Sequence, residues 1–200
     1  MQVRPIPSAI AKRVVAQKHY LHRAPPVSFC YGLFEGELMG VICFGVPASH
    51  HLRKSACPSD PSKVIELNRL WVDDIMPHNT ESYFIARALK LLPPLIVVSY
   101  ADTGVHHTGG IYRASNFNYA GWTDMDRKTP KFDVQPKERA IDLLGEVRQL
   151  HSRDTSRRDV ETVRVPRSKK FKYWITTGNR KERKVLARIC AWPRLEWDTP

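Results

Sequence analysis

A buried strand is the clearest element that the pattern of apolar and polar residues predicts in this chain. The apolar, largely β-branched run LIVV at positions 95–98 is typical of a strand covered on both faces. The run ends in Ser99, Tyr100 and Asp102, and a loop containing glycine and histidine follows it. Since open α/β sheets bind ligands beyond the carboxyl ends of their strands, we expect the functional site at this point.

The rest of the pattern predicts alternating helices and strands. In chain order we expect a helix at 8–18, a hairpin of strands at 27–34 and 38–46, an irregular loop at 47–62, a strand at 64–72, a helix at 81–92, a short helix carrying Tyr112 and a strand at 117–122. The strand–helix–strand order from 64 to 98, with short connections, indicates two neighbouring parallel strands. The chain is therefore predicted to form one mixed α/β sheet.

The strand at 64–72 (VIELNRLWV) carries polar residues on both faces. Simple alternation places Glu66 and Asn68 on one face and Leu67 and Arg69 on the other. Because neither face is purely apolar, we expect one of the polar side chains to point into a site.

Beyond residue 126 the pattern weakens. Residues 141–150 fit a short helix, 171–175 fit a strand, and 179–191 fit either a strand or a helix.

Charge separates the two parts of the chain more clearly than hydropathy does. The formal net charge is +12; residues 1–126 hold 12 Lys and Arg against 10 Asp and Glu, whereas residues 127–200 hold 20 against 10. Such an excess attracts polyanions through phosphate contacts and counterion release, and aromatic residues lie among the cations. We favour nucleic acid as a partner over a merely basic surface. We therefore divide the chain into a core, residues 1–126, and a basic C-terminal extension, residues 127–200, that packs on the core and contacts nucleic acid.

Hydropathy and cysteine content indicate a cytoplasmic protein. No apolar run reaches the length of a membrane span, and the N-terminal residues lack the apolar segment of a signal peptide. The four cysteines are scattered without a CxxC pair, which fits a reducing compartment. We expect no membrane partner.

Three stretches resemble the phage Mu Mom family of DNA-modification proteins. They are His19-Tyr20, ELNRLWV at 66–72, and SYADTGVHHTGGIYRASNFNYAGWT at 99–123. The element order and the short helix IYRASNF also resemble the GNAT superfamily of N-acetyltransferases. The resemblance implies a GNAT-like fold, in which a mixed, mostly antiparallel twisted sheet is flanked by helices. It also implies a phage enzyme in the cytoplasm of a bacterial host. This enzyme would convert adenine in double-stranded DNA to N6-(carbamoylmethyl)adenine and so protect DNA from restriction.

One departure from the GNAT pattern concerns the cofactor. Acetyl-CoA-dependent members carry a glycine-containing loop before the central helix, whose backbone N–H groups wrap the pyrophosphate. Here the segment at 73–80 has no glycine and two carboxylates, which argues against standard coenzyme A binding. The group donor is therefore not identified, and tRNA is one candidate partner. We expect Thr80, Ser99 and Tyr100 to contact the donor.

The resemblance and the end of the buried strand together suggest catalytic residues. Asp102 would bind the adenine amine or accept its proton, unless it only caps the following turn. Tyr112 matches the tyrosine that many GNAT enzymes use as a general acid, although it also fits ordinary helix packing. Arg69 would pair with Glu66 or with an anionic group of the donor. The other expected catalytic residues are His19, Tyr20 and Ser82.

The remaining candidate site residues are metal ligands and nucleic-acid contacts. Asp102 and His106, with a histidine at 19 or 22, would form a two-histidine, one-carboxylate set that suits iron. Alternatively, His106 contacts DNA phosphate or stays in solvent. The expected nucleic-acid contacts are Arg157, Arg158, Arg167, Lys169, Lys170, Lys172 and Trp174. Two other functions stay open: an acyltransferase that acts on a small amine or uses aminoacyl-tRNA, and a non-enzymatic nucleic-acid-binding regulator.

Overall fold

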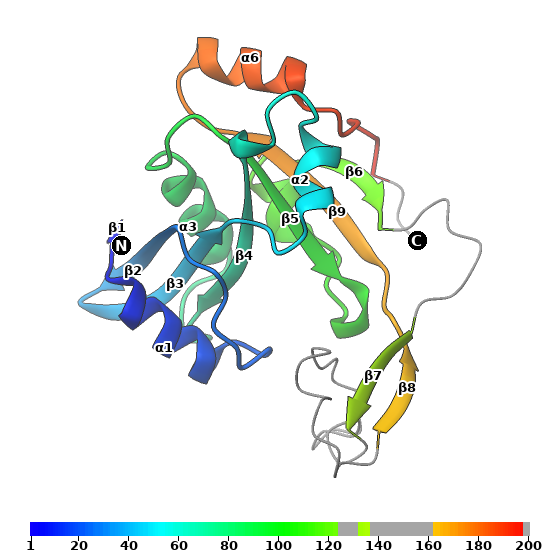
Figure 1. Ribbon diagram of the computed structural model, residues 1–200. Coiled ribbons are helices and arrows are strands. Elements are labelled where there is room, and N and C mark those ends of the chain that lie inside the picture. Colours follow the sequence, from blue (N-terminus) through cyan, green and yellow to red (C-terminus); the bar gives the residue numbers. More distant parts are fainter. Residues whose placement is uncertain (124–131, 137–161, 198–200) are drawn as a thin grey trace.

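A computed structural model of the chain describes residues 1–123, 132–136 and 162–197 (Figure 1). The described elements are, in chain order, β1 (Gln2–Pro5), α1 (Ser8–Lys18), β2 (Phe29–Glu35), β3 (Glu37–Gly45), α2 (His50–Ala56), a 3₁₀ helix (Pro61–Lys63), β4 (Val64–Val72), α3 (Thr80–Leu89), β5 (Ile96–Asp102), a second 3₁₀ helix (Thr103–Val105), α4 (Gly110–Ala114), β6 (Asn118–Trp122), β7 (Phe132–Pro136), β8 (Thr162–Pro166), β9 (Lys170–Thr176) and α6 (Arg180–Ile189). Within these residues, no helix is long and apolar enough to cross a membrane.

The main sheet has seven strands in the order β1-β2-β3-β4-β5-β9-β6. Its neighbouring strands run antiparallel except for β4 and β5, which are parallel as the strand–helix–strand pattern predicted. The predicted fold class, a mixed and mostly antiparallel sheet flanked by helices, is confirmed. A separate two-stranded sheet pairs β7 with β8.

Several elements differ from the prediction. The segment at 47–62 was expected to be an irregular loop but contains α2, and the short edge strand β1 was not expected. Residues 179–191, which fitted either element, form α6, while the expected helix at 141–150 lies outside the described residues. β9, assigned to the basic C-terminal extension, is an internal strand of the main sheet between β5 and β6. The division at residue 126 stays a prediction.

Helices cover both faces of this sheet (Figure 1). On one face, α3 and α4 bury Phe84 and Tyr112 against Leu67 and Val97. On the other face, α1 covers β2 and β3, while α2 and α6 pack around Trp174 of β9. The sheet is therefore the middle layer of three.

Two irregularities of β4 shape the sheet where functional residues were expected. β4 and β5 pair with each other only from Val64–Ile96 to Glu66–Val98, although each strand continues beyond that point and pairs with its other neighbour. On the other side of β4, Leu67 pairs with Phe44 and Arg69 with Cys43, so Asn68 is the extra residue of a β-bulge. The bulge reverses the alternation and places Glu66 and Arg69 on the same face. The predicted placement on opposite faces is wrong, because a one-residue shift moves side chains across the sheet.

Candidate active site

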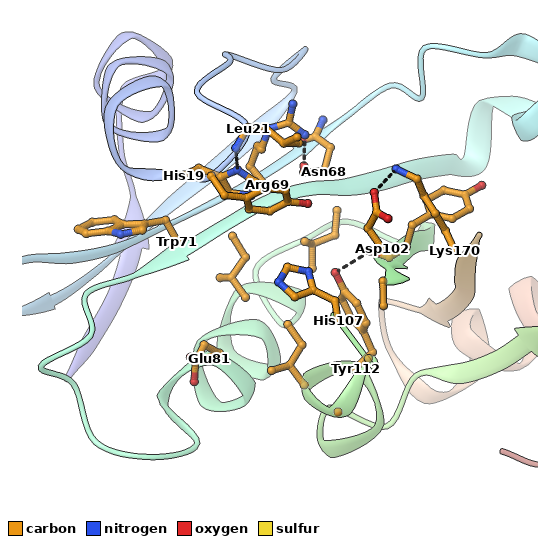
Figure 2. Close-up of a pocket in the computed structure, with 18 of the residues that line it drawn as sticks. His19, Leu21, Asn68, Arg69, Trp71, Glu81, Asp102, His107, Tyr112 and Lys170 are labelled. Carbon is orange, nitrogen blue, oxygen red and sulfur yellow. Dashed lines mark hydrogen bonds and ion pairs between the residues drawn. The ribbon is translucent and has the colours of Figure 1, made fainter. Parts of the chain in front are cut away.

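A cavity of about 590 Å³ lies where β4 and β5 separate (Figure 2). Its lining comes from the end of α1, from β4, from Glu81 of α3, from β5 and the loop after it, from α4, and from Lys170 of β9. All three stretches that carry the sequence resemblance contribute to this lining, although they lie far apart in the chain. The expected location beyond the end of the buried strand therefore coincides with a real cavity.

Asp102 is held in place by three donors at the edge of the cavity. One carboxylate oxygen, Oδ1, accepts hydrogen bonds from the backbone N–H of Gly104 at 2.9 Å and the hydroxyl of Ser168 at 2.6 Å. The other, Oδ2, lies 2.7 Å from Nζ of Lys170. Burial raises the pKa of this carboxyl, but the bonds from Lys170 and Ser168 outweigh burial and leave the pKa below its ordinary value. Asp102 is therefore ionised and a weak proton acceptor.

The environment of Glu66 has the opposite effect on its carboxyl from that of Asp102. Glu66 lines the cavity on the same face of the sheet as Arg69, because of the bulge at Asn68. Its side chain makes no hydrogen bond or ion pair with the described residues. Burial raises the pKa of Glu66, although the charges of Arg69 and Lys170 partly oppose that rise. A half-buried carboxyl with a raised pKa, and without a hydrogen bond to any described residue, is suited to accept a proton. Sequence reasoning treated Glu66 only as a partner for Arg69, because alternation hid the bulge.

Arg69 lines the cavity and donates hydrogen bonds to two backbone carbonyls. Its Nε donates to the carbonyl of Arg23 at 3.3 Å, and another guanidinium nitrogen donates to the carbonyl of Asn68. Burial lowers the pKa of Arg69, but an arginine stays charged at neutral pH. The guanidinium thus supplies a fixed positive charge beside Glu66.

Aromatic rings form one wall of the cavity. The rings of His19 and Tyr20 stack at a centroid distance of 4.4 Å, and Tyr20 meets His107 edge to face at 5.4 Å. Nδ1 of His19 accepts the backbone N–H of Leu21 at 3.2 Å, so its proton sits on Nε2. Burial, with the charge of Arg69, lowers the pKa of His19 to about 3, and the ring is neutral near pH 7. The structure thus brings both members of the His19-Tyr20 pair to the cavity.

Tyr112 reaches the cavity from α4. Its hydroxyl donates to the backbone carbonyl of Tyr100 at 3.4 Å, and its ring packs on that of Tyr173 at a centroid distance of 5.1 Å. Burial raises the pKa of Tyr112 to about 12, so the phenol keeps its proton at neutral pH. Tyr100 also lines the cavity, and burial raises the pKa of its phenol.

Three predicted residues do not line the cavity. The hydroxyl of Thr80 is buried and donates to the carbonyl of Pro77 at 2.6 Å, and that of Ser82 donates to the carbonyl of Asn79 at 2.9 Å. Ser99 is buried and donates to the carbonyl of Leu67 at 2.9 Å. These hydroxyls bond to backbone carbonyls in the structure, and their roles in catalysis or donor binding stay predictions.

The metal candidates do not gather into a set in the part of the chain that the structure describes. No group of three or more His, Cys, Asp or Glu side chains there could hold a metal ion. His106 lines the cavity with exposed side-chain surface and adopts a left-handed backbone conformation with φ 57°.

The predicted nucleic-acid contacts have different environments. Trp174 is a core residue, 2% exposed, whose Nε1 donates to the carbonyl of Pro193 at 2.9 Å. Lys170 lines the cavity and pairs with Asp102, while Lys169 stacks over Trp122 and Lys172 over Trp192. Arg167 is exposed, and Arg157 and Arg158 lie outside the described residues.

Comparison with known proteins adds family evidence to this geometry. The model of the Mom protein family matches residues 1–194. A relative from Escherichia phage Mu, named methylcarbamoylase mom, is 36% identical over 129 residues, which cover 60% of this chain and 54% of the relative. The matched region thus spans about half of that relative's length.

Two solved structures show more distant similarity. A GNAT-like decarboxylase, GphF, in complex with isobutyryl-CoA has a TM-score of 0.41 at 18% identity, over 61% of this chain and 88% of its own. An acetyltransferase of Bacillus subtilis in complex with CoA has a TM-score of 0.38 at 12% identity, over 75% of this chain and 77% of its own.

Proposed function

This chain belongs to the Mom protein family, and from that premise we propose that it is a phage-type DNA-modification enzyme. The proposed reaction transfers a carbamoylmethyl group to the N6 amine of adenine in double-stranded DNA, and the product would shield the DNA from restriction. The observation that carries the proposal is the convergence of the three family-like stretches on one cavity. The name methylcarbamoylase of the phage Mu relative supports the choice of transferred group.

The size and walls of the cavity suit an extruded base. At about 590 Å³ it has room for a purine together with a small donor group. The N6 amine is engaged in pairing within duplex DNA, so the adenine must leave the stack before it can react. Tyr20, which is 38% exposed and stacked on His19, offers the extruded base an aromatic surface.

Glu66 is our choice for the proton acceptor. As N6 forms a bond to the methylene carbon of the donor, the bond from that carbon to its leaving group breaks with its electron pair. The excess proton on N6 then moves to Glu66. Asp102 was the first candidate for this role, but both of its oxygens already accept hydrogen bonds, and its pKa lies below the ordinary value. We therefore assign Asp102 to holding Lys170 at the cavity.

Two further side chains serve the donor in this scheme. The protonated phenol of Tyr112 can donate a proton to the leaving group as its negative charge develops. The guanidinium of Arg69 can hold an anionic or carbonyl oxygen of the donor. The identity of the donor and the part played by coenzyme A or a metal are not assigned.

Mass spectrometry of nucleosides tests the reaction. Plasmid DNA from bacteria expressing the wild-type protein should contain a deoxyadenosine heavier by one carbamoylmethyl group. DNA from cells expressing Glu66→Gln should lack it, while the surface variant Lys12→Gln should match the wild type. Unmodified DNA from cells that hold folded wild-type protein, in a second bacterial host as well as the first, would refute the proposal.

A further inference from the structure

The helix α6 carries an unusual concentration of exposed cations. Five of its ten residues are basic and exposed, namely Arg180, Lys181, Arg183, Lys184 and Arg188. None of the five side chains makes a hydrogen bond or ion pair with the described residues. The single acidic residue, Glu182, accepts the backbone N–H of Asn179 at 2.7 Å as part of a capping box. The exposed side of α6 is thus a positive surface without internal compensation.

This arrangement is unfavourable for the helix on its own. Arg180 and Lys184, four residues apart, repel each other, as do Lys184 and Arg188. Arg180, Lys181 and Arg183 lie in the first turn, where the positive end of the helix dipole disfavours them. A polyanion bound along the exposed side would relieve both effects.

The packing of α6 fixes it to the sheet. Leu186 is buried with Trp174 and Trp192 in one apolar cluster, and the capping box at Asn179 begins the helix directly after β9. The cations of α6 therefore keep a defined position relative to β9.

A series of cations connects the cavity to α6 on this face of the sheet. Lys170 lines the cavity, Lys172 stacks over Trp192 at 5.4 Å from Nζ to the ring centroid, and Arg194 stacks over Trp174 at 5.1 Å from Cζ. Both tryptophans belong to the cluster that buries Leu186. In Figure 1, β9 runs along the sheet and leads into α6.

The register of β9 gives the length of this series. Lys170 pairs with Asp102 at one end of β9 and Thr176 pairs with Ile96 at the other. Six residues of strand span about 20 Å at about 3.3 Å each. The same distance corresponds to about six base pairs of duplex.

We propose that α6 binds the sugar–phosphate backbone of duplex DNA about six base pairs away from the adenine that occupies the cavity. This inference rests on the proposed function for the identity of the polyanion. It assigns to α6 a phosphate-binding surface separate from the cavity, which anchors the duplex while one base is extruded.

A binding experiment with duplexes of two lengths tests the inference. The test variant is Arg183→Gln/Lys184→Gln, and the matched control is Lys12→Gln/Arg13→Gln, which removes the same two residue types from the exposed side of α1. Fluorescence anisotropy measures affinity over a range of salt for duplexes of roughly 24 and roughly 8 base pairs with one central adenine; the short one ends before it reaches α6. Lys181→Gln/Arg188→Gln is a second test variant.

The expected result depends on duplex length. With the long duplex, the test variants should lower the slope of log affinity against log salt by about 2 and weaken binding at least about tenfold at 0.1 M salt. With the short duplex they should bind as the wild type does, and the control should match the wild type with both. Equal weakening of both duplexes, no weakening of either, or failure of the wild type to bind duplex DNA would overturn the inference. Length-dependent binding without any modified adenine in cells would instead refute the proposed reaction alone.

Discussion

Replacing Asp102 with asparagine removes one charge while keeping the shape of the side chain. The oxygen of asparagine can still accept from the N–H of Gly104 and the hydroxyl of Ser168. The amide nitrogen, however, would face the ammonium group of Lys170, and two donors would then oppose each other. The substitution therefore isolates the contribution of the ion pair.

The magnitude follows from the burial of the two partners. Removing one partner of a buried ion pair costs about 3–5 kcal/mol, because the other charge is left uncompensated. The side chain of Asp102 is 12% exposed, but that of Lys170 is 35% exposed and can regain some hydration. We expect a loss of about 2–3 kcal/mol, or about 5–10 °C in Tm for a chain of this size. The double variant Asp102→Asn/Lys170→Met should lose less than the sum of the single variants by about 1–2 kcal/mol.

The pH dependence of stability gives this prediction its sharpest test. The pKa of Asp102 is lower in the folded protein than in the unfolded chain, so its stabilisation is complete above about pH 4 and is lost as pH falls further. Urea unfolding should show a constant difference between wild type and Asp102→Asn from pH 8 to about pH 5, and a shrinking difference toward pH 3. Equal stability of the two proteins at pH 7, or a difference in their free energy of unfolding that does not change with pH, would show that Asp102 does not hold Lys170 by an ion pair.

Three further predictions address other residues. Glu66→Gln should lower adenine modification at least about 100-fold in a nucleoside assay, yet melt at the same or a higher temperature, because burial disfavours the ionised form of Glu66. A His19 imidazole with a pKa of about 3 should stay neutral from pH 7 to about pH 4 in NMR titrations. The free energy of unfolding should decrease as the pH falls below about 6.5, because there only the unfolded histidine gains a proton. His19→Gln should reduce that decrease. Gly36→Ala and Gly109→Ala both place a side chain at positive φ, but only at Gly109 would the new Cβ meet the Tyr173 ring. Thermal melts should therefore show a loss of stability of about 1–2 kcal/mol for Gly36→Ala and at least about 1 kcal/mol more for Gly109→Ala.

The parts of the fold that follow from local pattern could be predicted from the sequence. The parallel pairing of β4 with β5 follows from a strand, a helix and a strand joined by short connections. The helical state of α6 was left open, although the Asn179–Glu182 spacing of its capping box is visible in the sequence. The place of β9 between β5 and β6 could not be predicted, because pairing between distant strands leaves no local pattern.

The location of the cavity could be predicted from the sequence, but the details of its lining could not. The motif resemblance and the end of the buried strand indicated His19, Tyr20, Arg69, Asp102 and Tyr112, all of which line the cavity. The partner of Asp102 and the orientation of Glu66 depend on β9 and on the bulge in β4, and both are tertiary features. Thr80 and Ser82, in contrast, were expected in the donor site and among the catalytic residues respectively, but their hydroxyls bond to backbone carbonyls in the structure.

The central claim is that the cavity between β4 and β5 holds the reacting adenine next to Glu66. A crystal structure of the Glu66→Gln variant bound to a duplex with one target adenine tests this claim most directly. We predict an extruded adenine in the cavity, with N6 within about 3.2 Å of the side-chain oxygen at position 66. An adenine that stays stacked in the duplex, or that lies at another surface while the cavity is unoccupied, would contradict the account.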